Sequence, residues 1–194
     1  FGSLLEKIRT CRKGHEPLSD EMAAFYQAEE DVVLGIQGWI GRTVEHIRRL
    51  AAEEERPELR ENLVAMAAVN ENVLSEPPRT LREACQWIAW FNMASRTYNR
   101  DGAGGQLDEL LRPYYERDLA AGLIDDEEAI FLIACLLFND PHYYQLSGPD
   151  RHGRDLTSKV SYLILEAAHR LAAPNNLTVR VHDGMDERFL LTAV

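Results

Sequence analysis

Cysteine and positive charge are both scarce in this sequence. The 194 residues include three cysteines, Cys11, Cys85 and Cys135, which lie far apart along the chain. A small odd number of distant cysteines argues against a disulfide framework. Lys and Arg number 21 against 32 Asp and Glu, the formal net charge is −11, and no basic run stands clear of acidic neighbours. Nucleic-acid binding needs a basic face, so no nucleic-acid partner is expected.

Long apolar runs are lacking as well. No stretch approaches the roughly 18 apolar residues of a membrane-spanning helix, and the first residues do not have a signal-peptide layout. We therefore expect a cytoplasmic protein with no membrane association. With 45% hydrophobic and 27% charged residues, the composition is that of a globular domain with a substantial core. The chain begins at Phe1 and closes on Leu-Leu-Thr-Ala-Val in mid-pattern, so we expect a piece of a longer protein.

Complete catalytic and metal-binding motifs are also missing from the sequence. It has no Gly-x-Ser-x-Gly elbow and no His-Glu-x-x-His, and a di-iron bundle would need a second motif like Glu166-Ala-Ala-His169. The glycine-rich stretch before Gly105 lacks the Gly-Lys-Ser/Thr ending of a phosphate-binding loop. We therefore expect no metal or phosphate site. A metal-dependent hydrolase remains an alternative because four histidines fall within forty-one residues of one another, namely His142, His152, His169 and His182.

The first part of the chain predicts helices. Apolar residues recur every three to four positions after Ser19, and capping signals begin further helices at Thr80 and Asp125. We expect the helical part to cover about 19–138. A break is expected near Arg112 because Pro113 removes a backbone donor inside the helix that follows Leu107.

Residues 143–182 predict a strand, a helix and a second strand. Short apolar runs at 143–147 and 177–182 flank an amphipathic segment, and Gly-Pro-Asp and Pro-Asn-Asn turns separate the three. This order is typical of a parallel α/β unit. Period-two alternation places Tyr144 and Leu146 on one face of the first strand and its polar residues on the other, and Thr178, Arg180 and His182 share a face of the second.

Four motifs, in order, resemble the glycyl radical enzymes, the pyruvate formate-lyase and diol-dehydratase-like family. Pro77–Phe91 (PPRTLREACQWIAWF) is similar to the family's PPRTFxEALQxxWF, and Gly104–Leu119 (GGQLDELLRPYYERDL) to its GRxDQYLYPYYxxD. Ser147–Ala167 matches a glycine–aspartate turn followed by an LSYLxLEA-type helix, and Pro174–Leu190 is similar to PNLSVRxHxGxxxxFL. The resemblance covers nearly the whole chain and is firmest from Pro77 onward.

The resemblance implies an α/β fold: a predominantly helical segment of a ten-stranded α/β barrel, with residues 1–194 forming a partial pyruvate formate-lyase-like domain. In this family a radical S-adenosylmethionine activating enzyme installs a glycyl radical, which passes to a cysteine. The cysteine thiyl then abstracts a hydrogen from the substrate, and dehydrating members carry a glutamate two residues after this cysteine. Neither Gly-Cys-x-Glu nor a radical-glycine loop occurs here, so this segment is expected to hold no catalytic residue and no cofactor.

The function expected from the resemblance is that of an internal segment of a glycyl radical lyase or dehydratase of anaerobic metabolism. The expected partners of the parent protein are a small polar substrate, the activating enzyme and, in a homodimer, a second copy. A non-catalytic helical scaffold or interaction module derived from the same fold is the alternative.

Candidate substrate-binding residues come from one loop and from the two strands. Many family members carry Glu-Ser-Asn-Gly-His-Ser at this point, and its His and Ser contact the substrate hydroxyl in diol dehydratases. This chain has Asn99, Arg100 and Asp101 instead, so a glycerol or propanediol substrate is not expected. Arg100 suits an anionic group, and pairing with Asp101 or solvent is an equal alternative. The polar strand residues are candidates for lining the barrel: Gln145, Ser147, Arg180 and His182. For Arg180 a structural hydrogen bond is the alternative, because a buried charge needs a partner.

Overall fold

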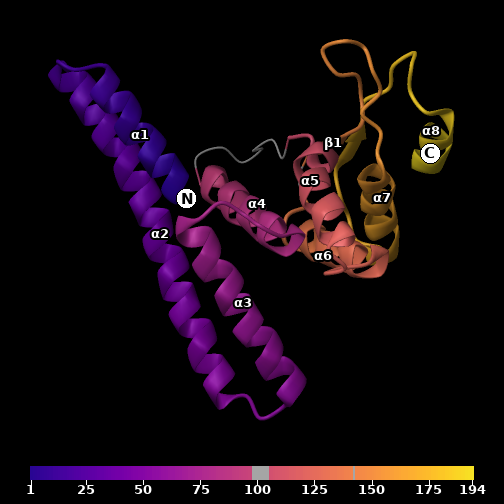
Figure 1. Cartoon of the computed structure of the whole chain (residues 1–194), viewed down its shortest axis with the longest axis horizontal. Coiled ribbons are helices and arrows are strands. Elements are labelled where there is room, and N and C mark those ends of the chain that lie inside the picture. The colour runs from indigo at the N-terminus through magenta and orange to yellow at the C-terminus, as the bar shows by residue number, and fades with distance from the viewer. Residues whose placement is uncertain (98–104, 142) are drawn as a thin grey trace. The chain divides into compact units, whose positions relative to one another are not determined.

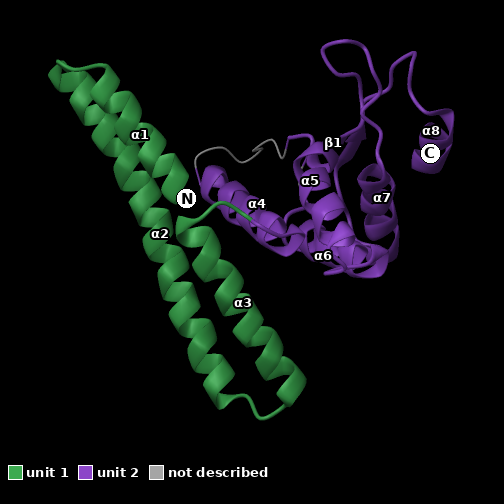
Figure 2. Ribbon diagram, viewed as in Figure 1, with its two compact units in different colours: residues 1–78 green, residues 79–194 purple. Residues whose placement is uncertain are grey.

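A computed structural model describes residues 1–97, 105–141 and 143–194 (Figure 1). The chain forms two compact units, residues 1–78 and residues 79–194 (Figure 2), and each is described by itself.

The first unit consists of three helices, α1 (Gly2–Gly14), α2 (Asp20–Glu53) and α3 (Pro57–Ser75). The Ser19 hydroxyl caps α2 by accepting the Met22 N–H at 3.2 Å, as the sequence predicts. One stripe of α2 is buried, including Val33, Ile40, Val44 and Ile47. Figure 1 shows α1 lying along the first part of α2 and α3 along its later part, so the two helices together cover this stripe.

Polar contacts fasten α1 within the first unit. Glu30 of α2 accepts hydrogen bonds from Arg9 at 3.0 Å and from Arg12 at 3.2 Å, both on α1. The amino group of Phe1 donates to the carbonyl of Val73 at 3.0 Å, and the Phe1 side chain is buried. Helical structure therefore begins well before residue 19, the start that the apolar pattern predicts.

The second unit begins with three helices, α4 (Leu81–Arg96), α5 (Leu107–Ala120) and α6 (Asp126–Asn139). Thr80 caps α4 and Asp125 caps α6, each through its side-chain oxygen. The break predicted near Arg112 does not occur, because α5 continues through Pro113. Leu111 and Tyr115 on either side of the proline are both buried, and their packing compensates for the lost backbone hydrogen bond.

The two strands, β1 (Tyr144–Leu146) and β2 (Leu177–Val179), pair in parallel, and α7 (Lys159–Leu171) connects them. Gln145 stands opposite Thr178 in this register. Both strands are shorter than predicted. Tyr143 and Ser147 have positive φ values of 23° and 61°, which end the extended backbone on either side of β1. A short helix, α8 (Glu187–Ala193), follows β2.

One apolar core fills the second unit. It combines the buried residues of α4, α5, α6 and α7 with Tyr144 and Leu146 of β1 and Phe189 of α8. Because Tyr144 and Leu146 point into this core, the alternate residues of the strand lie on the opposite face of the sheet. Among the described residues the helices cover the apolar face, while Gln145 and Thr178 on the other face are exposed, and this second face is called the open face below.

Two buried carboxylates join the elements of this unit. Asp108 at the start of α5 accepts the Ser147 N–H at 2.7 Å and the Ser161 hydroxyl of α7 at 2.6 Å. Asp118 near the end of α5 accepts the Leu81 N–H at the first turn of α4 at 2.6 Å. Each carboxylate thus satisfies backbone donors that packing has removed from water.

Replacing Ala172 by glycine is expected to stabilise the second unit by about 1 kcal/mol. Ala172 ends α7 with a left-handed backbone, φ 49° and ψ 32°, which is unfavourable for alanine and favourable for glycine. The measurement is urea unfolding followed by tryptophan fluorescence. The matched control, Ala168→Gly inside the same helix, should destabilise by about 1 kcal/mol instead. A loss of stability in the Ala172 variant would contradict the prediction.

Candidate functional site

A row of polar residues crosses the open face of the sheet. Gln145 and Thr178 are paired neighbours and both are exposed. Gln106, just before α5, extends the row through a parallel bridge to Gln145, whose N–H donates to the Gly105 carbonyl at 2.9 Å. Paired residues of neighbouring strands point to the same side, so these three side chains share the open face.

Arg180 joins this row from the end of β2. It lies two residues beyond Thr178, and its N–H still donates to the Leu146 carbonyl at 3.1 Å. Its guanidinium Nη1 donates to Gln106 Oε1 at 3.1 Å, while Gln106 Nε2 donates to the Ser147 carbonyl at 2.8 Å. The amide of Gln106 is therefore held from both ends, with its oxygen directed at Arg180.

Ser147 lies away from the open face. Its side chain is fully buried, because its positive φ turns the backbone out of the strand alternation that would place it beside Gln145. The hydroxyl accepts the Gly148 N–H at 2.5 Å and lies 2.8 Å from Thr157 Oγ1. Ser147 thus belongs to a buried polar network rather than to the surface formed by Gln145.

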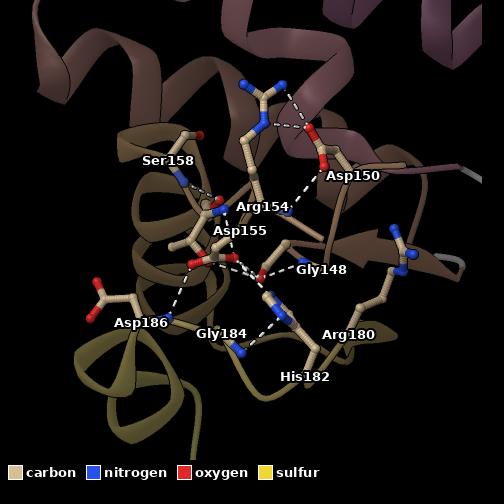
Figure 3. A network of polar contacts seen from close by, with 12 residues as sticks. Gly148, Asp150, Arg154, Asp155, Ser158, Arg180, His182, Gly184 and Asp186 are labelled. Carbon is tan, nitrogen blue, oxygen red and sulfur yellow. Dashed lines mark hydrogen bonds and ion pairs between the residues drawn. The ribbon is translucent and has the colours of Figure 1, made fainter. Parts of the chain in front are cut away.

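Asp155 is the centre of that network (Figure 3). Its Oδ1 accepts the N–H of Thr157 at 3.1 Å, the Thr157 hydroxyl at 2.9 Å and His182 Nε2 at 3.1 Å. Its Oδ2 accepts the N–H of Asp186 at 3.0 Å. The Gly184 N–H donates to His182 Nδ1 at 3.2 Å, which assigns the histidine proton to Nε2. One carboxylate therefore joins the 148–158 loop, the chain after β2 and the start of α8.

The side chains of the two basic residues that follow β2 point in different directions (Figure 3). The His182 ring points at Asp155, whereas the Arg180 guanidinium points away from Asp155. The His182 ring therefore stabilises the 148–158 loop through Asp155, whereas the Arg180 guanidinium lies at the open face beside Gln106.

Lowering the pH is expected to remove the contribution of Asp155 to stability. Burial raises the pKa of Asp155, but the hydrogen bonds from His182, Thr157 and Asp186 outweigh burial and hold the pKa below its ordinary value. A carboxyl group with a lowered folded-state pKa stabilises the protein fully above the unfolded-state pKa, about 3.9, and this contribution is lost as the pH falls through the folded-state value. Urea unfolding of the wild type and Asp155→Asn from pH 7 to pH 3 measures it. The difference between the two proteins should be largest near neutrality and shrink below about pH 4; a constant difference would contradict the prediction.

The remaining sequence-based predictions concern the loop before α5, metal binding and membrane association. Asn99, Arg100 and Asp101 lie outside the described residues. Within the residues that the structure describes, no three His, Cys, Asp or Glu side chains come together as a possible metal site. Glu166 of the ExxH motif forms an ion pair with Arg170 at 2.6 Å. No helix in the described ranges is both long and apolar enough to cross a membrane.

Burial favours the protonated thiol at two of the three cysteines. Burial raises the pKa of Cys85 to about 12, and burial also raises the pKa of Cys135, which lies on the exposed side of α6. A thiol with a raised pKa is a poor nucleophile at neutral pH.

Sequence reasoning missed Gln106, Asp108 and Asp155. All three lie inside the motifs that carry the family resemblance, which is a signal that these positions matter. Gln106 stands where the family motif GRxD has arginine. Their roles depend on which backbone groups reach them from distant parts of the chain, and spacing along the sequence does not contain that information.

Comparison with known proteins identifies the family. The profile of the pyruvate formate lyase-like family matches residues 2–194. The isethionate sulfite-lyase of Desulfovibrio desulfuricans is 29% identical over 98% of this chain and 26% of that protein. The 4-hydroxyphenylacetate decarboxylase glycyl radical subunit of Clostridioides difficile is 27% identical over 98% of this chain and 24% of that protein.

Solved structures agree with these relatives. The crystal structure of a glycyl radical enzyme from Archaeoglobus fulgidus superposes with a TM-score of 0.85 and 26% identity over 97% of this chain and 28% of that chain. The chain therefore spans about a quarter of the length of the proteins it matches. The resemblance drawn from the four motifs and the predicted fold class are both confirmed: this chain belongs to the pyruvate formate lyase-like family and has the fold of a segment of the glycyl radical enzyme barrel.

Proposed function

We propose that this chain is an internal segment of a glycyl radical lyase or dehydratase that acts on a small polar molecule by thiyl-radical hydrogen abstraction. The observation that carries the proposal is the family match over residues 2–194. The names of two relatives, a sulfite-lyase and a decarboxylase glycyl radical subunit, support a bond-breaking reaction.

The segment would shape the substrate chamber without supplying the reactive groups. No cysteine of this chain is followed two residues later by glutamate, so the catalytic cysteine and the radical glycine would belong to other parts of the parent protein. A radical S-adenosylmethionine activating enzyme would install the radical, in anaerobic metabolism in the cytoplasm. The parent protein would act as a homodimer.

The residues proposed to face the substrate are those on the open side of the sheet. Gln145 and Arg180 lie there, and Gln106 joins them. Asn99, Arg100 and Asp101 remain proposed substrate contacts from the loop before α5. The buried position of Ser147 and the hydrogen bond of the partly buried His182 to Asp155 support a different role, in which they hold the 148–158 loop against the end of the sheet.

The test is anaerobic reconstitution of the full-length protein that contains this chain with its activating enzyme and S-adenosylmethionine. We expect the electron paramagnetic resonance signal of a carbon-centred glycyl radical. We then expect turnover of one member of a panel that includes isethionate, 4-hydroxyphenylacetate and neutral diols. An enzyme that forms no glycyl radical while a known member of the family does so under the same conditions would overturn the proposal.

A further inference from the structure

Arg180 is a charged group for which the described residues supply no opposite charge. Its guanidinium is partly buried and makes one side-chain hydrogen bond, to the neutral amide of Gln106. No carboxylate in the described ranges lies within ion-pair distance of it. Two other partly buried arginines of this unit differ in this respect, because Arg96 pairs with Asp140 and Arg112 pairs with Glu109. A guanidinium stays protonated at every physiological pH, so its partial burial without a counter-charge is unfavourable.

The backbone beneath Arg180 is adapted to hold the guanidinium in place. A Cβ on Gly148 would come within 2.8 Å of Arg180 Cβ and within 2.9 Å of Arg180 Cζ and Nε. The arginine side chain therefore lies directly on the glycine backbone, and Gln106 fixes its far end. An ordered guanidinium loses little further conformational freedom on binding a ligand.

The side chains that surround Arg180 on the open face carry no charge of their own. The neighbouring side chains on the open face, Gln106, Gln145 and Thr178, are neutral and can donate hydrogen bonds. Gln106 replaces the arginine of the family motif, so this chain places one positive charge here rather than two.

We propose that the Arg180 guanidinium, with Gln106 beside it, is a binding site for an anionic group with two oxygens in one plane, such as a carboxylate or a sulfonate. Guanidinium groups bind such oxygens in pairs. The anion has two possible sources, a free small molecule in the chamber or a carboxylate side chain from another part of the parent protein. The inference depends on the proposed function in one respect, namely that the open face lines the substrate chamber of the parent enzyme.

The first experiment tests a free anion. Isothermal titration calorimetry is carried out on the full-length, non-activated protein with methanesulfonate and its neutral isostere dimethyl sulfone, and with acetate and acetamide. We expect the wild type to prefer the anion of each pair by about tenfold or more, the size of one or two hydrogen bonds between charged groups. Arg180→Met should abolish the preference, and Arg180→Lys should retain part of it. Gln106→Leu is the matched control, because it removes the neutral hydrogen bond and keeps the charge.

The second experiment tests a carboxylate of the parent protein. In that case the free anions do not compete, and Arg180→Met lowers the melting temperature by an amount that shrinks when salt is raised to about 1 M. Arg180→Lys would restore part of this stability, and the loss in Gln106→Leu would not depend on salt. If Arg180→Met changes neither the anion preference nor the salt-dependent stability, the inference is overturned. Neither experiment needs the radical, so a failure of radical formation leaves this result independent of the proposed function.

Discussion

Replacing Asp108 by alanine is expected to lower the unfolding free energy of the second unit by about 3–5 kcal/mol. The carboxylate is fully buried and accepts the Ser147 N–H and the Ser161 hydroxyl. Alanine would leave a backbone N–H without a partner and remove the acceptor of the Ser161 hydroxyl, and each unmade buried hydrogen bond to a charged group costs about 1.5–3 kcal/mol. The elements α5, β1 and α7 would lose their common anchor.

Urea unfolding measures this effect if each unit is followed separately. Trp39 belongs to the first unit and Trp87 and Trp90 to the second, so a Trp39→Phe background makes fluorescence a reporter of the second unit. The control is Asp125→Ala, which removes a solvent-facing cap of α6 and should cost about 1 kcal/mol. A double-mutant cycle with Ser161→Ala should show coupling between the two residues. Equal losses for the Asp108 and Asp125 variants would contradict the role given to Asp108.

Replacing Gly148 by alanine is expected to cost about 2–4 kcal/mol for two separate reasons. Its φ of +98° is unfavourable for any residue with a Cβ. The new Cβ would also overlap Arg180, so the side chain that lies on the glycine must move. We therefore expect both destabilisation and loss of the Arg180–Gln106 hydrogen bond.

Gly153 provides the matched control for this substitution. It has a similar backbone, with φ +78°, but nothing lies within 4 Å of the position that a Cβ would occupy. Gly153→Ala should therefore cost only the backbone term, about 1–2 kcal/mol, and the excess in Gly148→Ala measures the overlap with Arg180. Combining Gly148→Ala with Arg180→Ala removes the contacts to Nε and Cζ and should recover part of the excess. If the two glycine variants are equally destabilised, Arg180 does not pack on Gly148 in solution.

Local signals in the sequence predicted much of the second unit. Thr80 and Asp125 each have a side chain that can cap a helix, and both helices begin where these residues stand. The parallel pairing of residues near 144–146 and 177–179 follows from the strand–helix–strand order. Pro113 shows the limit of such reasoning, because the burial of Leu111 and Tyr115 keeps the helix continuous where local propensity alone favours a break.

The site was predictable only in part. Alternation along the strands correctly separates Gln145 from the buried Tyr144 and Leu146. It fails at Ser147, because alternation assumes an extended backbone and Ser147 has a left-handed one. It also treats Arg180 and His182 alike, although the chain bends after β2 and directs the histidine to Asp155 and the arginine to Gln106.

By itself, the sequence determined the class of this protein. Helix caps, apolar spacing and four ordered motifs are local features, and local features are enough to establish secondary structure and family. Only the tertiary structure decided what the polar residues do. Asp108 and Ser147 are 39 positions apart, and Gln106 and Arg180 are 74 apart. Whether a carboxylate is a buried anchor, or a guanidinium is left with an open side, depends on which distant groups the folded chain brings to it.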